Sequence, residues 1–349
     1  MDRHTPHALG TRDELPAEYL DALAALNLAP LWPSLRDALP FGAPNTRTRP
    51  THWAWRGIRP LLLQAGELTP MDKAERRVLV LCNPGRGLEN LQASAAIYLG
   101  MQLVLPGEVA PNHRHTPNAV RIVVEGEGGW TIVEGERCPM ARGDLILTPT
   151  GLWHEHHHAG TGPLVWLDVL DLPLVLALDR SYCTPGEPQQ QRNPRDGYLS
   201  GGIAPVIAGA RANSRYPVLR FEWRRTEAAL RALAASTPHD ATVQVAYVNP
   251  ETGGDVLNTI AFNALMLRPG QSVTLPRISP SRVYHVVEGD ADADVDGNAL
   301  RLAVADTFCA PGLARVAITN RSATKPLFLI GADESPVHRK LGYYEEFPA

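Results

Sequence analysis

One pattern of turns occurs twice in this chain of 349 residues, and it constrains the fold more than any other feature. Each copy has a Pro-Gly turn, then a Val-Val-Glu-Gly turn, then a later proline turn. The matched positions are Gly107 and Gly270, Gly126 and Gly289, and Pro149 and Pro311, which are 163, 163 and 162 residues apart. Three landmarks that hold register to one residue indicate a tandem duplication of one small module.

Short alternating apolar runs separated by turn residues fill both copies, for example Gln102–Leu105 and Thr131–Val133. The chain contains 29 glycines and 31 prolines, which favours many turns and short strands. We therefore expect a mainly β fold of two tandem antiparallel β-barrels behind an N-terminal helical arm. The expected divisions are an arm with lead-in strands over 1–95, a first barrel over 96–180, a linker with a short helix over 181–240, a second barrel over 241–335 and a tail over 336–349.

Helical patterns precede the first copy. Apolar side chains at helical spacing predict a helix over Pro16 to Leu26. A second helix is predicted from Thr69 as N-cap, with proline at its first position, to about Leu81. Lys73 and Arg77 would then share one helical face. A third, short helix is predicted around Thr226 to Ala235.

Composition excludes several classes of protein. A net charge of −4, without a run of Lys or Arg, argues against nucleic-acid binding. The most apolar stretch, Leu164 to Leu178, is too short and too charged to span a membrane. The N-terminus lacks the apolar region of a signal peptide. Four widely separated cysteines are typical of reduced thiols. We therefore expect a cytoplasmic protein.

Three histidines of the first copy have the spacing of a metal site. His113 and His115 point to the same side if they lie on a strand, and His154 follows the later proline turn. Imidazole is a common ligand of zinc, iron, copper and nickel. The same spacing in the second copy falls on Pro276, Ile278 and Val316, so we expect one metal ion per chain. His285 is expected to be a structural or interface histidine.

This frame resembles the cupin superfamily, with its motifs G-x5-H-x-H-x3-E-x6-G and G-x5-P-x-G-x2-H-x3-N. Two positions depart from the motifs, because Ala119 stands at the glutamate position and His158 at the asparagine position. The resemblance implies a bicupin of the double-stranded β-helix, or jelly-roll, type. Without the carboxylate, three neutral ligands would leave a divalent ion its full charge and open positions for an anionic chelating substrate.

More specific segments resemble the gentisate 1,2-dioxygenase family, with its salicylate and 1-hydroxy-2-naphthoate relatives. A looser similarity lies in Tyr247–Gly254. The main segments are Glu75–Arg77, Gln102–Pro111, His113–Thr116, Arg121 before Val-Val-Glu-Gly, Leu147–Pro149, Trp153–His156 and Trp166–Asp168.

The family resemblance implies non-haem Fe(II), one ion per chain, bound by His113, His115 and His154, with O2 as co-substrate. It implies cleavage of gentisate between its carboxyl- and hydroxyl-bearing carbons to give maleylpyruvate. A monohydroxylated acid is the alternative substrate: salicylate, a 5-substituted salicylate such as nitro- or halo-salicylate, or 1-hydroxy-2-naphthoate. Other classes are a zinc or manganese cupin isomerase or hydrolase, and a metal-free binding or storage bicupin. The resemblance also implies a homotetramer, with a dimer as the alternative.

The remaining site residues combine strand alternation with this resemblance. Arg121 shares the inner face with Ala119 and would hold a substrate carboxylate, with a structural ion pair as the alternative. Gln102 would hydrogen-bond the substrate or serve as a core amide. His156 shares the face of His154. Asp168 would anchor a ligand histidine or a substrate hydroxyl, or be structural.

Other residues are implied by the resemblance alone. Arg77 matches a family arginine that reaches the substrate carboxylate, with a solvated helix stripe as the alternative. Tyr98, Leu79 and Lys73 fall at expected pocket-wall positions. His157 and His158 are expected to be solvent-facing or structural.

Overall fold

The computed structural model describes residues 9–193, 198, 206 and 215–349, so part of the predicted linker lies outside the described residues. The chain divides into two compact units, Met1–Arg47 and Thr48–Ala349. The first unit holds α1 (Ala17–Ala25), which confirms the first predicted helix, and the short α2 (Leu35–Ala38). In the described part of the chain, no helix has both the length and the apolar character needed to cross a membrane.

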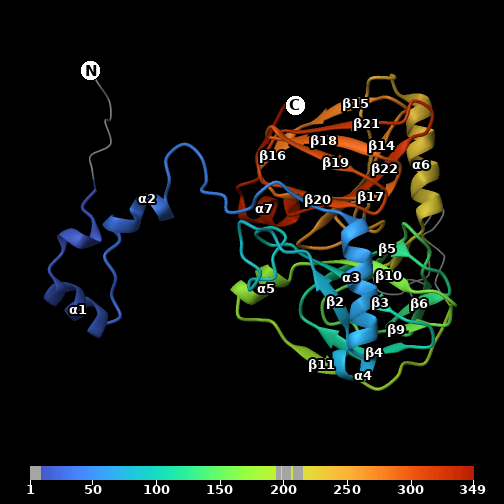
Figure 1. The fold of residues 1–349 in the computed structure, drawn as a ribbon, viewed down its shortest axis with the longest axis horizontal. Helices are drawn as coiled ribbons and strands as arrows, with labels where there is room; N and C mark the ends of the chain where they lie inside the picture. Colours follow the sequence, from blue (N-terminus) through green and yellow to red (C-terminus); the bar gives the residue numbers. More distant parts are fainter. Residues whose placement is uncertain (1–8, 194–197, 199–205, 207–214) are drawn as a thin grey trace. The chain divides into compact units, whose positions relative to one another are not determined.

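The second unit contains the two predicted β repeats, drawn cyan to green and orange to red in Figure 1. The first repeat consists of two facing antiparallel sheets that do not close into a barrel. One sheet has the order β12-β8-β5-β10-β3-β2 and the other β11-β4-β9-β6-β7. The strands are β2 (Arg77–Val80), β3 (Tyr98–Val104), β4 (Val109–His115), β5 (Ala119–Glu125), β6 (Gly129–Val133), β7 (Glu136–Pro139), β8 (Leu145–Thr148), β9 (His154–His158), β10 (Leu164–Leu170), β11 (Cys183–Pro185) and β12 (Arg220–Phe221).

The second repeat reproduces this arrangement. Its sheets have the orders β1-β20-β17-β22-β14-β13 and β15-β21-β18-β19, with a short β16-β23 pair beside them. The strands are β1 (Thr51–Trp53), β13 (Val243–Ala246), β14 (Ala261–Leu267), β15 (Ser272–Leu275), β16 (Arg277–Ile278), β17 (Arg282–Glu288), β18 (Ala291–Val295), β19 (Asn298–Leu302), β20 (Thr307–Ala310), β21 (Val316–Asn320), β22 (Leu327–Asp333) and β23 (Glu346–Phe347). A short helix follows each repeat, α5 (Leu172–Ala177) and α7 (Ser335–Leu341).

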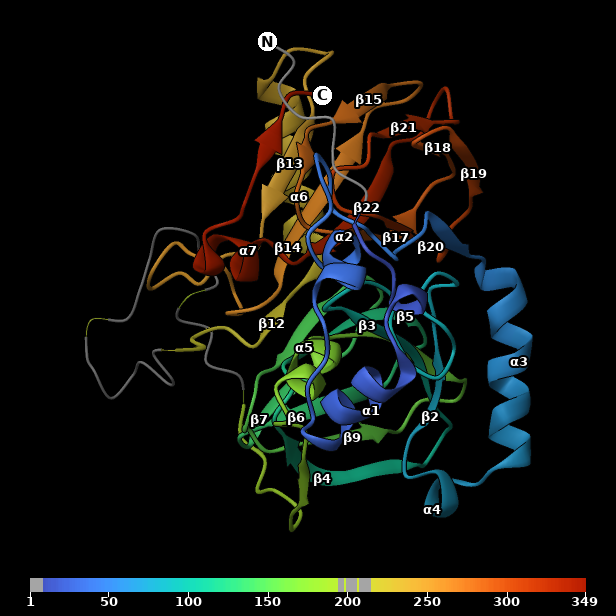
Figure 2. The ribbon, with the colours of Figure 1, turned by 90° about the vertical axis from the view of Figure 1, so that its left-hand side faces the viewer.

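The repeats exchange strands. β1 precedes the first repeat but pairs with β20 of the second, while β12 precedes the second repeat but pairs with β8 of the first. A helix of 14 residues follows each exchanged strand: α3 (Trp55–Leu68) packs on β2 and β3, and α6 (Trp223–Ser236) packs on β13 and β14. Figure 2 shows α3 running beside β2. Each repeat therefore begins with a strand and helix that sequence analysis did not recognise as part of it.

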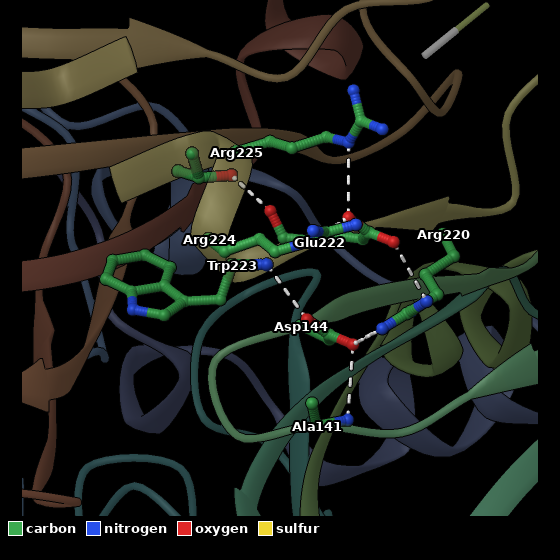
Figure 3. A network of polar contacts seen from close by, with 8 residues as sticks. Ala141, Asp144, Arg220, Glu222, Trp223, Arg224 and Arg225 are labelled. Carbon is green, nitrogen blue, oxygen red and sulfur yellow. Dashed lines mark hydrogen bonds and ion pairs between the residues drawn. The ribbon is translucent and has the colours of Figure 1, made fainter. Parts of the chain in front are cut away.

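A buried aspartate fastens each exchanged strand to its helix. Asp144 accepts hydrogen bonds from the backbone N–H of Trp223 at 2.8 Å and from the guanidinium of Arg220 at 2.7 Å, as Figure 3 shows. Asp306, at the matching position, accepts from the N–H of Trp55 at 2.7 Å and from His52 Nε2 at 2.8 Å. The two networks share one design, so the duplication includes the strand–helix arms.

The helix predicted over 69–81 is wrong. Its helical part is the single turn α4 (Met71–Ala74), and Glu75 ends the turn with a positive φ of 54°, which a right-handed helix cannot continue. The chain then enters β2, whose run of Val78, Leu79 and Val80 suits a strand. Lys73 and Arg77 therefore do not share a helical face. The longer helix of this region is α3, which precedes the turn and contains Pro60.

Candidate metal centre

Three histidines of the first repeat converge between its two sheets. His113 and His115 lie on β4, and His154 lies on the neighbouring strand β9, directly opposite His113. One ring nitrogen from each of them lies within 4.8 Å of the other two. A register shift in the β4·β9 pair falls between Ala110 and His113, as at the β-bulges that often aim side chains into active sites.

Backbone carbonyls fix the orientation of all three rings. Each Nδ1 donates to a carbonyl oxygen two residues away, which leaves the other nitrogen, Nε2, as a lone-pair donor. Within the described residues, Nε2 of His113 and of His154 is buried without a hydrogen-bond partner. The carbonyl partners are Pro111 for His113 (2.9 Å), Pro117 for His115 (2.8 Å) and Leu152 for His154 (2.9 Å).

Electrostatics keeps these histidines neutral. Burial, together with the charge of Arg76, lowers the pKa of His113 to about 3. Burial lowers the pKa of His115 to about 4 and that of His154 well below its ordinary value. Neutral imidazoles are the form that binds metal ions. Three convergent, unprotonated nitrogens, two of them buried without a hydrogen-bond partner among the described residues, fit a divalent transition metal.

Two opposite charges lie side by side on the inner face next to the histidines. Arg121 on β5 pairs in register with Asp168 on β10, and its Nε lies 3.4 Å from Asp168 Oδ1. Arg121 Nη1 donates to Thr148 Oγ1 at 2.6 Å. Burial lowers the pKa of Arg121 to about 10, and burial raises the pKa of Asp168 although Arg121 opposes that shift. The structure thus contains the ion pair, and Arg121 Nε still has no hydrogen-bond acceptor among the described residues.

Gln102 and Tyr98 share this inner face on β3, because Gln102 lies opposite Trp166 and Tyr98 lies opposite Leu170 of β10. Gln102 Nε2 is buried and has no hydrogen-bond partner in the described part of the chain. Burial, helped by the charge of Asp168, raises the pKa of Tyr98 and keeps its phenol protonated. Both side chains therefore offer hydrogen-bond donors on the inner face.

The last histidines of β9 divide between the two faces. The ring of His156 lies 5.8 Å from that of His154, its Nδ1 contacts Thr131 Oγ1 at 2.9 Å, and its Nε2 is buried. His157 stacks on Trp130 at 5.1 Å, outside the site. His158 Nε2 donates to the carbonyl oxygen of Gly162 at 2.6 Å, a structural contact. His156 therefore belongs to the site, and His157 and His158 do not.

Arg76, rather than Arg77, reaches the site. Arg77 and Leu79 lie opposite Leu103 and Met101, which places them on the face away from Gln102. Arg77 donates to the carbonyl of Gly66 and pairs with Glu108.

Arg76 precedes β2 by one residue. Because side chains alternate along a strand, its side chain lies on the inner face with that of Val78, which is opposite Gln102. Its charge lowers the pKa of His113, His115 and His156. Arg76 Nη2 is buried and unbonded within the described residues. Strand alternation, applied to β2 instead of a helix, would have identified it.

The second repeat has no such centre. His113, His115 and His154 form the one group of three potential ligands found in the described residues, which agrees with one metal site per chain. Where His113 faces His154, Leu275 faces Val316. His285 is buried and bonds Thr307 Oγ1 at 3.0 Å, so it is structural, as predicted.

Comparison with known proteins gives a consistent result. Residues 100–170 match the model of the family described as Cupin domain. A gentisate 1,2-dioxygenase of Ralstonia sp is 58% identical over 97% of this chain and 96% of its own. A 5-aminosalicylate 1,2-dioxygenase of Comamonas sp is 37% identical over 94% of this chain and 90% of its own. The crystal structure of a salicylate 1,2-dioxygenase adduct with gentisate, from Pseudoaminobacter salicylatoxidans, superposes with a TM-score of 0.86 at 29% identity, covering 97% of this chain and 96% of that one.

Proposed function

Because the chain belongs to the gentisate 1,2-dioxygenase family of cupin ring-cleaving dioxygenases, we propose that it cleaves gentisate. Cleavage falls between the carboxyl-bearing and the hydroxyl-bearing carbon, both atoms of O2 enter the product, and the product is maleylpyruvate. The observation that carries this proposal is a cluster of three neutral histidines beside two arginines, each with one buried nitrogen, Arg121 Nε and Arg76 Nη2, that has no hydrogen-bond partner among the described residues.

Fe(II) is the metal we propose for His113, His115 and His154. When bound, it supplies a Lewis acid, a template for a chelating substrate and a route for electrons between the ring and O2. The three ligands are neutral, so the charge of the ion is not reduced by a carboxylate. Because Ala119 replaces the glutamate of the cupin motif, the site favours an anionic, chelating substrate.

The protein's own residues bind and orient that substrate. Arg121 and Arg76 offer guanidinium donors to the carboxylate, a bidentate contact that suits arginine. Gln102, His156 and Tyr98 offer hydrogen-bonding groups to its hydroxyls. Asp168 orients Arg121 through their 3.4 Å contact and holds its charge in place. These assignments are proposals built on the inner-face positions of the residues.

A monohydroxylated or 5-substituted salicylate is the second candidate substrate. It is favoured by the similarity to the salicylate dioxygenase structure and to the 5-aminosalicylate dioxygenase. The inner face would bind the shared ortho-hydroxy carboxylate in the same way. Gentisate comes first because the gentisate dioxygenase is the more similar relative, at 58% identity.

We also propose a cytoplasmic homo-oligomer, a tetramer before a dimer. All four cysteines are free thiols, as a reducing compartment favours. In the second unit, Leu61 and Leu176 are exposed, so apolar surface is available for assembly. Light scattering coupled to size-exclusion chromatography measures the oligomeric state, and a monomer would refute this part of the proposal.

Oxygen uptake tests the function. Protein reconstituted with Fe(II) is offered gentisate, salicylate, 5-substituted salicylates and 1-hydroxy-2-naphthoate in parallel, and the product is identified by mass. We expect fast uptake and maleylpyruvate with gentisate. Uptake only with a monohydroxylated acid would keep the reaction and change the substrate. No uptake with any of them, from protein shown to hold iron, would refute the proposed substrate class.

A further inference from the structure

A buried threonine contacts the histidine that lies next to the metal ligands. Thr131 on β6 lies directly opposite His156 on β9, and its Oγ1 is 2.9 Å from His156 Nδ1. The other ring nitrogen, Nε2, is buried and has no hydrogen-bond partner in the described part of the chain. His156 therefore has one nitrogen committed to Thr131 and one nitrogen available inside the site.

The hydroxyl of Thr131 has a second neighbour that can take its single hydrogen. Its Oγ1 lies 3.8 Å from Met140 Sδ, and a thioether sulfur can only accept. With the hydroxyl hydrogen directed to the sulfur, Oγ1 accepts from His156 Nδ1–H and Nε2 keeps its lone pair. Thr131 is fully buried, so water does not compete for these contacts.

The second repeat shows that folding does not require this pair. The cross-strand pair at the matching position in β18 and β21 is Ala293 and Ile318. Both members are apolar there, in the repeat that also lacks the metal ligands. The Thr131–His156 pair is thus found only in the repeat that carries the site.

We propose that Thr131 is a positioning residue, which holds His156 as the Nδ1–H tautomer and so presents Nε2 as a hydrogen-bond acceptor to a hydroxyl of the substrate. The part of the inference that concerns the substrate rests on the proposed function. The tautomer is a property of the protein alone and can be measured separately. Thr131 acts through His156 and does not itself reach the metal centre.

Thr131→Val removes the hydroxyl and keeps the shape, while Thr131→Ser keeps the hydroxyl. In the Fe(II)-loaded enzyme, Thr131→Val should lower kcat/KM for gentisate by ~2- to 10-fold, the effect of one net hydrogen bond, and Thr131→Ser should stay within about twofold of the wild type. The matched control is Thr307→Val, which removes the same kind of bond from buried His285 in the second repeat. It should lose a similar amount of thermal stability and leave kcat/KM unchanged.

A double mutant separates positioning from packing. On a His156→Ala background, Thr131→Val should cause no further loss of kcat/KM, because its effect passes through the imidazole. An equal further loss on that background, or wild-type kcat/KM in Thr131→Val, would overturn the proposal.

A second readout does not depend on substrate. Long-range ¹H–¹⁵N spectra of the full chain, labelled with ¹⁵N-histidine and loaded with diamagnetic zinc, report which nitrogen of His156 carries the proton. We expect Nδ1–H in the wild type and in Thr131→Ser, and a shift toward Nε2–H in Thr131→Val. Nε2–H in the wild type, or an unchanged tautomer in Thr131→Val, would overturn the assignment. If the wild type cleaves none of the acids, the proposed function fails while this spectrum still decides the role of Thr131.

Discussion

The two repeats share a fold and differ in the side chains that line their interiors. In the first, the inner face carries Gln102, Arg121 and Asp168 next to three histidines. In the second, Leu265, Tyr284 and Gly331 occupy the positions of those three polar residues in the sheet register. Gly331 leaves room for the ring of Tyr284, since a Cβ there would lie 3.0 Å from it, and that ring stacks on Phe308 at 5.0 Å.

This difference shows that chemistry and packing compete for the same positions. The second interior is a contiguous apolar cluster, which includes Leu265, Tyr284, Val316 and Ile318. The first interior keeps buried polar atoms without partners among the described residues, and each such atom costs about 1–3 kcal/mol when no ligand meets it. A functional interior is therefore less stable by itself than its filled duplicate.

The largest effect should follow from removing a metal ligand. His113→Ala, His115→Ala or His154→Ala should abolish iron binding and reduce turnover to background, while the circular dichroism spectrum stays that of the wild type. The control is His285→Ala in the second repeat, which should keep one iron per chain. Retained iron in any of the three ligand variants, measured by elemental analysis, contradicts the ligand assignment.

The next largest effect should follow from removing the arginine on the inner face of the first repeat. Arg121→Ala should raise KM or lower kcat, with a loss of ~10- to 100-fold in kcat/KM, the range for a hydrogen bond to a charged group, while iron stays bound. The matched control, Tyr284→Phe, changes the equivalent position of the second repeat and should leave kinetics unchanged. An unchanged kcat/KM for Arg121→Ala would remove Arg121 from the site.

Neighbouring arginines should separate function from stability. Arg76→Met should raise KM for gentisate by about tenfold and leave the free energy of unfolding nearly unchanged, because Arg76 is partly exposed. Arg77→Met should do the reverse and cost about 2 kcal/mol of stability, because Arg77 is buried and bonds Gly66 and Glu108. Steady-state kinetics and urea unfolding measure the two effects. The opposite result would mean that Arg77, and not Arg76, faces the interior, so that the pairing of β2 with β3 is shifted by one residue.

The smallest effect concerns acid stability. Burial raises the pKa of Asp306, but hydrogen bonds from His52 and from the N–H groups of Ala303 and Trp55 outweigh it, and the net pKa is lowered. A lowered carboxyl pKa stabilises the fold above the unfolded-state pKa, near 4, and this stability is lost as pH falls through the folded-state value. Asp306→Asn should therefore show a shallower loss of unfolding free energy as the pH falls below the unfolded-state pKa, near 4. An unchanged slope in urea titrations would mean that Asp306 does not contribute.

Sequence reasoning succeeded where side-chain type and spacing decide the structure. The duplication, the clustering of the three histidines, the β strands and the lack of matching histidines in the second repeat follow from the positions of Gly, Pro and His and from the alternating apolar runs. It failed where tertiary pairing decides. Val78–Val80 have neighbours that fit a helix as well as a strand, and only pairing with β3 shows that Arg76 faces inward.

The helix predicted around Thr226 to Ala235 is confirmed as α6, but the repetition of the strand–helix arms was missed for a related reason. Trp55 and Trp223 are 168 residues apart whereas Asp144 and Asp306 are 162 apart, so a fixed offset does not align both. The hydrogen bonds made by Thr131 and Thr148 could not be predicted, because a buried threonine in a strand is common and its hydroxyl partner depends on the fold.

The strand exchange also sets the order in which the chain can be completed during synthesis. β1 leaves the ribosome before either repeat, yet Thr51 pairs with Cys309, near the end of the chain. β8 likewise waits for β12 before its edge is covered. The sheet of the first repeat is complete only when β12 has been made, and β1 stays unpaired until β20 emerges, so nascent chains carry open strand edges. The repeat without a metal site therefore completes the fold. A truncated chain that ends before β20 leaves β1 unpaired.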